Sequence, residues 1–278
     1  MAVAIRTELP EVEAMTTFGD CIQLKPAAEN LWAGAADLDY SHPAGQFGGW
    51  TAAALLKAVL SEPSAQNAPL SLTVMFTDAI GDGPIQISTR PLRAGARLQF
   101  WRAEISQRDK VCAHAQITLG ARRATKGFTD AVMPEMPPSD DPSLVSFSPP
   151  SKFGEQLEAR WPAGPSMFTG PDAPARTIAW TRHRQGFAMD HALLAVLADY
   201  APPRVMMKRG RFMLSSTVSM NVYFHASEDE LAAVGFDFVL TETDCRRCEG
   251  GYFDHSLKLW SKSGALLMTS EQVAAFRD

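Results

Sequence analysis

The sequence has few cysteines, no long apolar run and no excess of positive charge. Its four cysteines, at positions 21, 112, 245 and 248 of 278, do not form a disulfide framework, so we expect a reduced, cytoplasmic setting. No apolar run approaches the roughly 20 residues of a membrane span, so we expect no membrane insertion. The first 15 residues carry acids and lack an apolar core, which is not typical of a secretory signal. The net charge of −5 argues against general nucleic-acid binding.

What the chain does contain is a composition suited to a globular core, with 46% hydrophobic and 21% charged residues. Its strand-like and helical patterns occur twice in the same order. In the first half we expect strands at 20–25 and 30–37, a buried helix ending near Leu60, and strands at 71–77, 85–92, 98–107 and 111–119. In the second half we expect a strand at 176–184, a helix at 190–199, and strands at 216–224, 235–243, 251–261 and 265–276.

The two halves are separated by a segment rich in proline, serine and aspartate, in which we expect a short helix at 152–160. We therefore predict an N-terminal unit at 1–122, a linker at 123–165 and a C-terminal unit at 166–278. The fold class is α+β, and each unit is one long buried helix wrapped by a curved antiparallel sheet.

The last residue of the second helical run, DHALLAVLAD, is the acid Asp199. Asp199 shares a small apolar face with Ala192, Ala195 and Val196. It also stands at the helix end whose dipole opposes negative charge. A carboxylate in that position is either a hydrogen-bonded turn residue before Pro202 or a functional group.

Aligning the two halves favours a functional group. The helices match at an offset of 138, which sets Ser61 against Asp199. The following strands set Thr73 against Thr217 and Gln116 against Gln272. We therefore predict that both halves share the Thr and Gln positions and that only the second half carries an acid.

Several short motifs together resemble the type II acyl-CoA thioesterases. They are HPAGQFGG at 42–49, LTV at 72–74, LAD at 197–199, STV at 216–218 and a glutamine at 272. The resemblance spans nearly the whole chain except the linker and implies a double hotdog fold. The chain departs from the family at Trp50, where a glutamine is frequent, and in the basic, cysteine-containing turn at 245–251. These departures concern acyl or carrier specificity more than the reaction.

The resemblance implies that Asp199, Thr217 and Gln272 hold a hydrolytic water for attack on an acyl-CoA thioester. In that reading Asp199 is the base, and its burial should raise its pKa. We expect Phe47, Gly48, Gly49 and Trp50 to contact substrate, with a backbone N–H of Gly48 or Gly49 stabilising the oxyanion. We expect no metal and no cofactor, coenzyme A being part of the substrate. The substrate is an acyl-CoA or acyl-carrier thioester, and the protein is expected to form a homodimer or larger homo-oligomer.

Other readings of these residues remain open. Thr217 is equally explained by strand packing, and Gln272 by solvation. A hotdog hydratase or dehydratase would need an Asp–His pair, for which Asp39, His42, Asp190 and His191 are candidates. Asp190 and His191 also fit a helix start. A non-catalytic acyl-thioester binding protein would bind ligand without turnover.

Two further signals are weaker. The spacing of Cys245 and Cys248 is that of half a zinc knuckle or a redox pair, but no second pair exists. Lys208, Arg209 and Arg211 form a basic cluster that suits either coenzyme A phosphates or a solvated loop.

Overall fold

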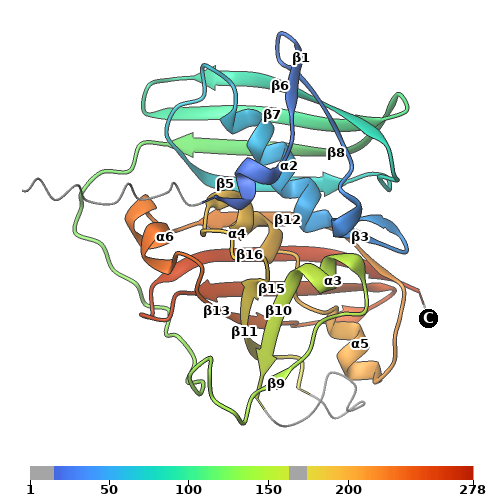
Figure 1. Cartoon of the computed structure of the whole chain (residues 1–278), viewed down its shortest axis with the longest axis vertical. Coiled ribbons are helices and arrows are strands. Elements are labelled where there is room, and N and C mark those ends of the chain that lie inside the picture. The colour runs from blue at the N-terminus through green and yellow to red at the C-terminus, as the bar shows by residue number, and fades with distance from the viewer. Residues whose placement is uncertain (1–15, 163–173, 278) are drawn as a thin grey trace, which may run out of the picture.

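The structure is a computed structural model that describes residues 16–162 and 174–277, and one antiparallel sheet dominates it (Figure 1). The strand order is β1-β2-β6-β7-β8-β5-β12-β16-β15-β13-β11-β10-β9, and β14 pairs with β15. A separate two-stranded sheet joins β3 and β4. The strands of the first half are β1 (Lys25–Ala28), β2 (Leu31–Ala35), β3 (Ser41–His42), β4 (Gly45–Gln46), β5 (Ala68–Phe76), β6 (Pro84–Ala94), β7 (Leu98–Gln107) and β8 (Lys110–Gly120). The later strands are β9 (Val145–Ser146), β10 (Leu157–Trp161), β11 (Thr177–His183), β12 (Ser215–Phe224), β13 (Val239–Asp244), β14 (Cys248–Glu249), β15 (Tyr252–Trp260) and β16 (Leu266–Phe276).

The strand order is symmetric about the pair β5–β12, where the two halves join edge to edge. Outward from this seam, β8, β7, β6 and β2 on one side correspond to β16, β15, β13 and β11 on the other. Across the seam, the hydroxyl of Thr73 donates to Asn221 Oδ1 at 2.9 Å. This arrangement is the double hotdog that the repeated sequence pattern predicts.

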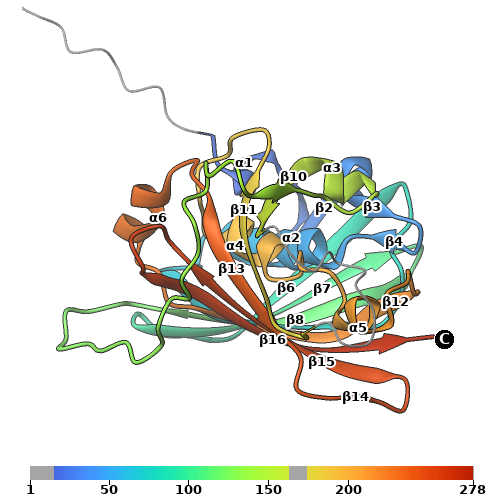
Figure 2. The same ribbon diagram turned by 90° about the horizontal axis from the view of Figure 1, so that it is seen from below.

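Two buried helices lie side by side on the concave side of the sheet (Figure 2). They are α2 (Gly48–Leu60) and α4 (His191–Leu197), and nearly all of their side chains are buried. Both helices are rich in small residues that are fully buried, such as Ala53 and Ala195. The remaining helices are short: α1 (Phe18–Cys21), η1 (Leu38–Tyr40), α3 (Lys152–Gln156), α5 (Arg204–Arg209) and α6 (Glu228–Val234). Within the described residues, no helix has the length and apolar character needed to cross a membrane.

The predicted strand at 20–25 is wrong, because most of that segment belongs to a short helical turn and the loop after it. Thr17 caps α1 by accepting from the Asp20 N–H, while the Asp20 side chain accepts from the Thr17 N–H. This reciprocal capping box stabilises a helix start and outweighs the strand preference of the residues that follow.

The predicted linker is irregular only in its first part. The helix expected at 152–160 ends at Gln156, and the chain then enters the sheet as β10, paired with β11. The earlier part covers a separate apolar cluster formed by Trp180, Phe238, Leu240 and Trp260. In particular, Trp180 Nε1 donates to the Pro137 carbonyl at 2.7 Å. The prolines therefore belong to a segment that packs against the second half.

The predicted correspondence of Thr and Gln between the halves is also wrong. Each seam strand has one register shift, between Pro69 and Ser71 in β5 and between Thr217 and Ser219 in β12. Alignment on this shift places Thr217 against Pro69 and Gln272 against Ile117. Consistent with this register, Gln116 is exposed whereas Gln272 is buried. The polar pair is thus particular to the second half.

The helix ends differ by one residue from the sequence alignment. Ser61 caps the C-terminus of α2 as Ala198 caps that of α4, so the counterpart of Asp199 is Glu62. Glu62 is buried beside the sheet, where it accepts from Trp32 Nε1 at 2.7 Å and from the Thr89 hydroxyl. The first half therefore does carry an acid near this position, but its carboxylate is occupied by structural hydrogen bonds.

Candidate active site

Asp199 lies where the C-terminus of α4 meets the N-terminus of α2. It is the second residue after the last helical residue, Leu197, rather than part of the helix. The backbone N–H of Gly49 donates to its carboxylate. A Cβ built on Gly48 would stand 2.6 Å from Asp199 Oδ2, so only glycine leaves room for the carboxylate. The positive end of the α2 dipole thus offsets the unfavourable end of α4.

Two side chains from the sheet complete the surroundings of this carboxylate. The Thr217 hydroxyl on β12 lies 3.1 Å from Asp199 Oδ1 and 3.2 Å from Gln272 Oε1. Because the hydroxyl has one proton, it donates to one of these oxygens at a time. Gln272 Nε2 on β16 donates to the Ala198 carbonyl at 2.8 Å and also approaches Asp199. The three predicted catalytic residues therefore meet, although they come from three separate segments.

Burial raises the pKa of Asp199 to about 7, and the hydrogen bonds from Thr217, Gly49 and Gln272 oppose this rise only in part. At neutral pH the carboxyl group is therefore poised between its acid and base forms. A group with that pKa both accepts and returns a proton readily, as a general base must.

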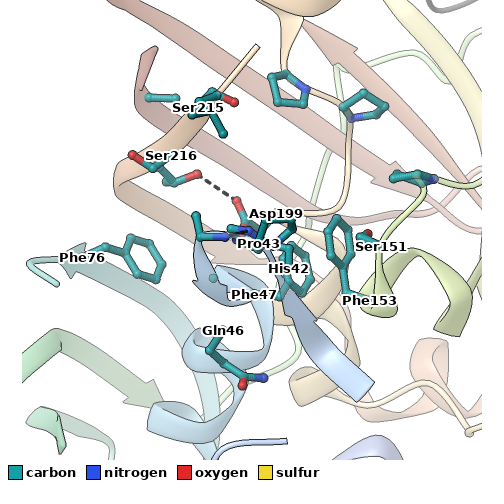
Figure 3. Close-up of a pocket in the computed structure, with 18 of the residues that line it drawn as sticks. His42, Pro43, Gln46, Phe47, Phe76, Ser151, Phe153, Asp199, Ser215 and Ser216 are labelled. Atoms are coloured by element: carbon teal, nitrogen blue, oxygen red, sulfur yellow. Dashed lines mark hydrogen bonds between the residues drawn. The ribbon is translucent and has the colours of Figure 1, made fainter. Parts of the chain in front are cut away.

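The carboxylate opens into a cavity of about 740 Å³. Most of its walls are aromatic or aliphatic, and no lysine or arginine is among the described residues that line it. Phe47 and Phe153 stack at 4.3 Å between ring centroids on one side of Asp199, and Phe76 stands on the other (Figure 3). The low polarity of these walls is the cause of the raised pKa, and it suits an apolar ligand.

Two of the four residues predicted to contact substrate lie on the cavity wall. Phe47 and Gly48 line the cavity. Gly49 is not among the lining residues, and its N–H donates to Asp199. Trp50 is a correction, since it is 3% exposed and packs in the main core rather than on the cavity. The first turn of α2 is helical, so consecutive side chains point about 100° apart and Trp50 turns away from the cavity.

The two glycines of this turn predict a pair of contrasting variants. Gly48→Ala should displace the Asp199 carboxylate and lower kcat by at least about tenfold while the fold persists. Gly49→Ala should instead push against the Val196 carbonyl, 2.5 Å from the new Cβ, and destabilise the fold by about 1–3 kcal/mol. Kinetics together with thermal unfolding of both proteins checks this. If Gly48→Ala lost as much stability as Gly49→Ala but kept the wild-type kcat, the placement of Asp199 beside Gly48 would be contradicted.

The Asp and His residues considered for a hydratase do not form a pair. Asp190 caps α4, accepting from the N–H groups of Leu193 and Gly19. His191 is buried against Phe224 and is not among the residues that line the cavity. His42 does line it, and its Nδ1 accepts from the Ala44 N–H.

Neither the metal nor the redox interpretation of the cysteine pair gains support within the described residues. Burial raises the pKa of the Cys245 thiol to about 11, which disfavours the reactive thiolate. Across residues 16–162 and 174–277, no group of His, Cys, Asp and Glu side chains is arranged to hold a metal ion.

Sequence reasoning missed several residues of the cavity. Phe153 comes from the predicted linker, and Phe212 from the loop after α5. His255, on β15, was also missed, although the alternation of β15 places it on the same inner face as Phe253 and Leu257. That alternation was a usable signal, since a histidine interrupts an otherwise apolar face.

The fold and site together define a double hotdog with one carboxylate-centred pocket at the junction of its two helices. Family models agree with this. An acyl-CoA thioesterase N-terminal domain model matches residues 37–120, and an acyl-CoA thioesterase C-terminal domain model matches residues 130–276. The chain belongs to the acyl-CoA thioesterase family and is a thioester hydrolase.

Solved structures share this architecture. A conserved protein of unknown function with a hot dog fold from Alicyclobacillus acidocaldarius is 31% identical, with a TM-score of 0.87, and the match covers 94% of this chain and 98% of that one. A putative thioesterase II from Thermobifida fusca YX is 19% identical, with a TM-score of 0.83 and coverage of 95% and 100%. A tesB protein of Mycobacterium avium subs paratuberculosis is 20% identical, with a TM-score of 0.76 and coverage of 92% and 97%. The search of curated proteins gave no match.

Proposed function

We propose that the protein hydrolyses acyl-CoA thioesters to a free carboxylic acid and coenzyme A, with Asp199 activating the water. The observation that carries this proposal is the Asp199 carboxylate, held 3.1 Å from the Thr217 hydroxyl at the wall of an apolar cavity. Thr217 and Gln272 are the groups that would orient the water beside it.

In the first step, the water oxygen forms a bond to the thioester carbonyl carbon as Asp199 takes a proton from the water. The carbonyl oxygen then carries the negative charge. The C–S bond breaks when this tetrahedral intermediate collapses, and the thiolate leaves with the electron pair. Asp199 returns its proton to the thiolate sulfur, which restores the carboxylate for the next turnover.

The oxyanion needs a donor that is not already engaged. Gly49 N–H donates to Asp199, so we propose the Gly48 N–H at the start of α2 for this role. Gly48 lines the cavity, and the positive end of the α2 dipole favours a developing negative charge there.

The charged part of coenzyme A would remain outside the apolar cavity. Lys208, Arg209 and Arg211 are exposed and immediately precede Phe212, which lines the cavity and is 66% exposed itself. We propose that this basic cluster meets the nucleotide phosphates. We further propose that hydrolysis needs no cofactor, and that the enzyme acts in lipid metabolism in the cytoplasm as a homo-oligomer.

A panel of acyl-CoAs of increasing chain length, with detection of the free thiol, tests this function. We expect thiol release that is unaffected by a metal chelator. An enoyl-CoA included in the panel distinguishes the hydratase alternative, because hydration consumes the double bond without releasing thiol. Tight acyl-CoA binding without thiol release from any member would reject the proposal in favour of a binding protein.

A further inference from the structure

A second polar group faces the cavity beside the proposed catalytic residues. His255 is 4% exposed and lines the cavity. Its Nε2 atom is buried and has no hydrogen-bond partner within the described residues. A buried polar atom without a partner is unfavourable, and a ligand oxygen in the cavity would supply the missing hydrogen bond once the imidazole ring turned toward it.

The position of His255 relates it directly to the reacting centre. On the paired strands β15 and β16, His255 lies opposite Gln272, and both side chains point to the inner face. Neighbouring strands are about 4.8 Å apart, so the imidazole lies roughly one strand spacing beyond the residue that approaches Asp199. A group a few carbon atoms from the thioester would come within its reach.

The surroundings of His255 are apolar and enclosed. Phe253 precedes it on the same face, and Phe253 belongs to a small buried cluster with Val205, Met206, Met213 and Ala274. The residues of the cavity rim are far more open, Phe212 and Leu214 being 66% and 60% exposed. This apolar lining suits an acyl group rather than the charged coenzyme A.

His255 is neutral in this environment. Burial, aided by the positive charge of Arg204, lowers its pKa to about 3. A neutral imidazole has one donor and one acceptor nitrogen, so it pairs with a hydroxyl or, through its N–H, with a carbonyl oxygen. An unsubstituted alkyl chain packed against it would leave Nε2 without a hydrogen bond.

We propose that His255 hydrogen-bonds an oxygen on the acyl chain, so that the enzyme prefers hydroxyacyl or oxoacyl thioesters to unsubstituted chains of the same length. This inference rests on the thioesterase function proposed above. It makes His255 a specificity-determining residue, acting on the acyl group rather than on the water.

The test compares kcat/KM for octanoyl-CoA, 3-hydroxyoctanoyl-CoA, 5-hydroxyoctanoyl-CoA and 3-oxooctanoyl-CoA. We expect the wild-type enzyme to favour at least one oxygenated chain over octanoyl-CoA by about 10- to 100-fold. His255→Phe should remove most of this preference, mainly by gaining activity on octanoyl-CoA and losing it on the oxygenated chain. His255→Gln, which keeps a hydrogen-bonding group, should retain part of it.

Phe253→Leu is the matched control, because it changes the same wall without altering its polarity and should change all four rates together. The proposal is overturned if wild type shows no preference for any oxygenated chain. It is also overturned if His255→Phe slows all four substrates equally, since every one carries the same pantetheine amides. In both cases hydrolysis of octanoyl-CoA would still uphold the thioesterase function. If His255→Phe fails to fold, the wild-type ratio and His255→Gln decide the question.

Discussion

Asp199→Asn should lower kcat for acyl-CoA hydrolysis by about 10²- to 10⁴-fold. Asparagine preserves the shape of the side chain and still accepts a hydrogen bond from Gly49, but it cannot take a proton from water. Measurement of free thiol with the best substrate of the panel gives the ratio of the wild-type kcat to that of Asp199→Asn. Full hydrolysis by this variant would exclude Asp199 as the base.

The same variant should be more stable than wild type above pH 7, which separates a catalytic loss from misfolding. The folded-state pKa of Asp199, about 7, is above the unfolded value of 3.8. The resulting stabilisation is complete below pH 3.8 and is lost as pH rises to 7, where the buried group becomes charged. Removing that charge should therefore increase the free energy of unfolding at pH 8 by on the order of 1–3 kcal/mol.

Glu62→Gln provides the matched control in the first half. Glu62 occupies the position corresponding to Asp199 after α2, but it is bonded to Trp32 and Thr89 and does not line the cavity. We expect this variant to keep its hydrolytic rate and to lose some stability, because two hydrogen bonds to a charged acceptor become weaker. A comparable loss of rate in both variants would show that the effect is general rather than catalytic.

The pH profile should show the second large effect. A general base acts in its deprotonated form, so kcat/KM should fall about tenfold per pH unit below 7, reaching roughly a hundredfold loss at pH 5. Above pH 7 the profile should level off, since Asp199 is then fully ionised. Activity and stability should thus change in opposite directions with pH. A midpoint near pH 4, the usual range of an exposed aspartate, would contradict the buried placement of the carboxylate.

The extent to which sequence predicts this fold differs between elements. The helix that ends near Leu60 follows from a continuous apolar run, because it is buried on nearly all sides. The strands around 98–107 and 111–119 show the apolar alternation that burial on one face produces. The turn at Thr17 and the strand β10 were missed, because a capping box and a pairing with a distant strand outweigh local preference. The repeat was recognised, but its residue alignment failed at the register shifts in β5 and β12, which leave no signal in composition.

In the candidate site, too, some residues could be recognised from the sequence and others only from the assembled structure. Asp199 was noticeable because an acid on an apolar helix face violates a local rule, and the structure brings Thr217 and Gln272 to it. Trp50 was placed wrongly, since its neighbours in sequence line the cavity while its own side chain enters the core. His255 lay on a recognisable inner face, but that this face borders a cavity could not be known before the strands were assembled.

Asp199 illustrates what the sequence determined and what the tertiary structure determined. The sequence by itself determined an α+β chain with two related halves, a carboxylate at the end of the second helical run, and the motifs of a thioesterase. Only the tertiary structure decided that this carboxylate meets the N-terminus of the other helix. It also decided that Thr217 and Gln272 have no polar counterparts in the first half. Finally, it decided that the Glu62 carboxylate is engaged in hydrogen bonds with Trp32 and Thr89. The reason is physical: periodicity records which face of an element is buried, whereas a pKa, a hydrogen bond and a cavity depend on what the neighbouring elements bring to that face.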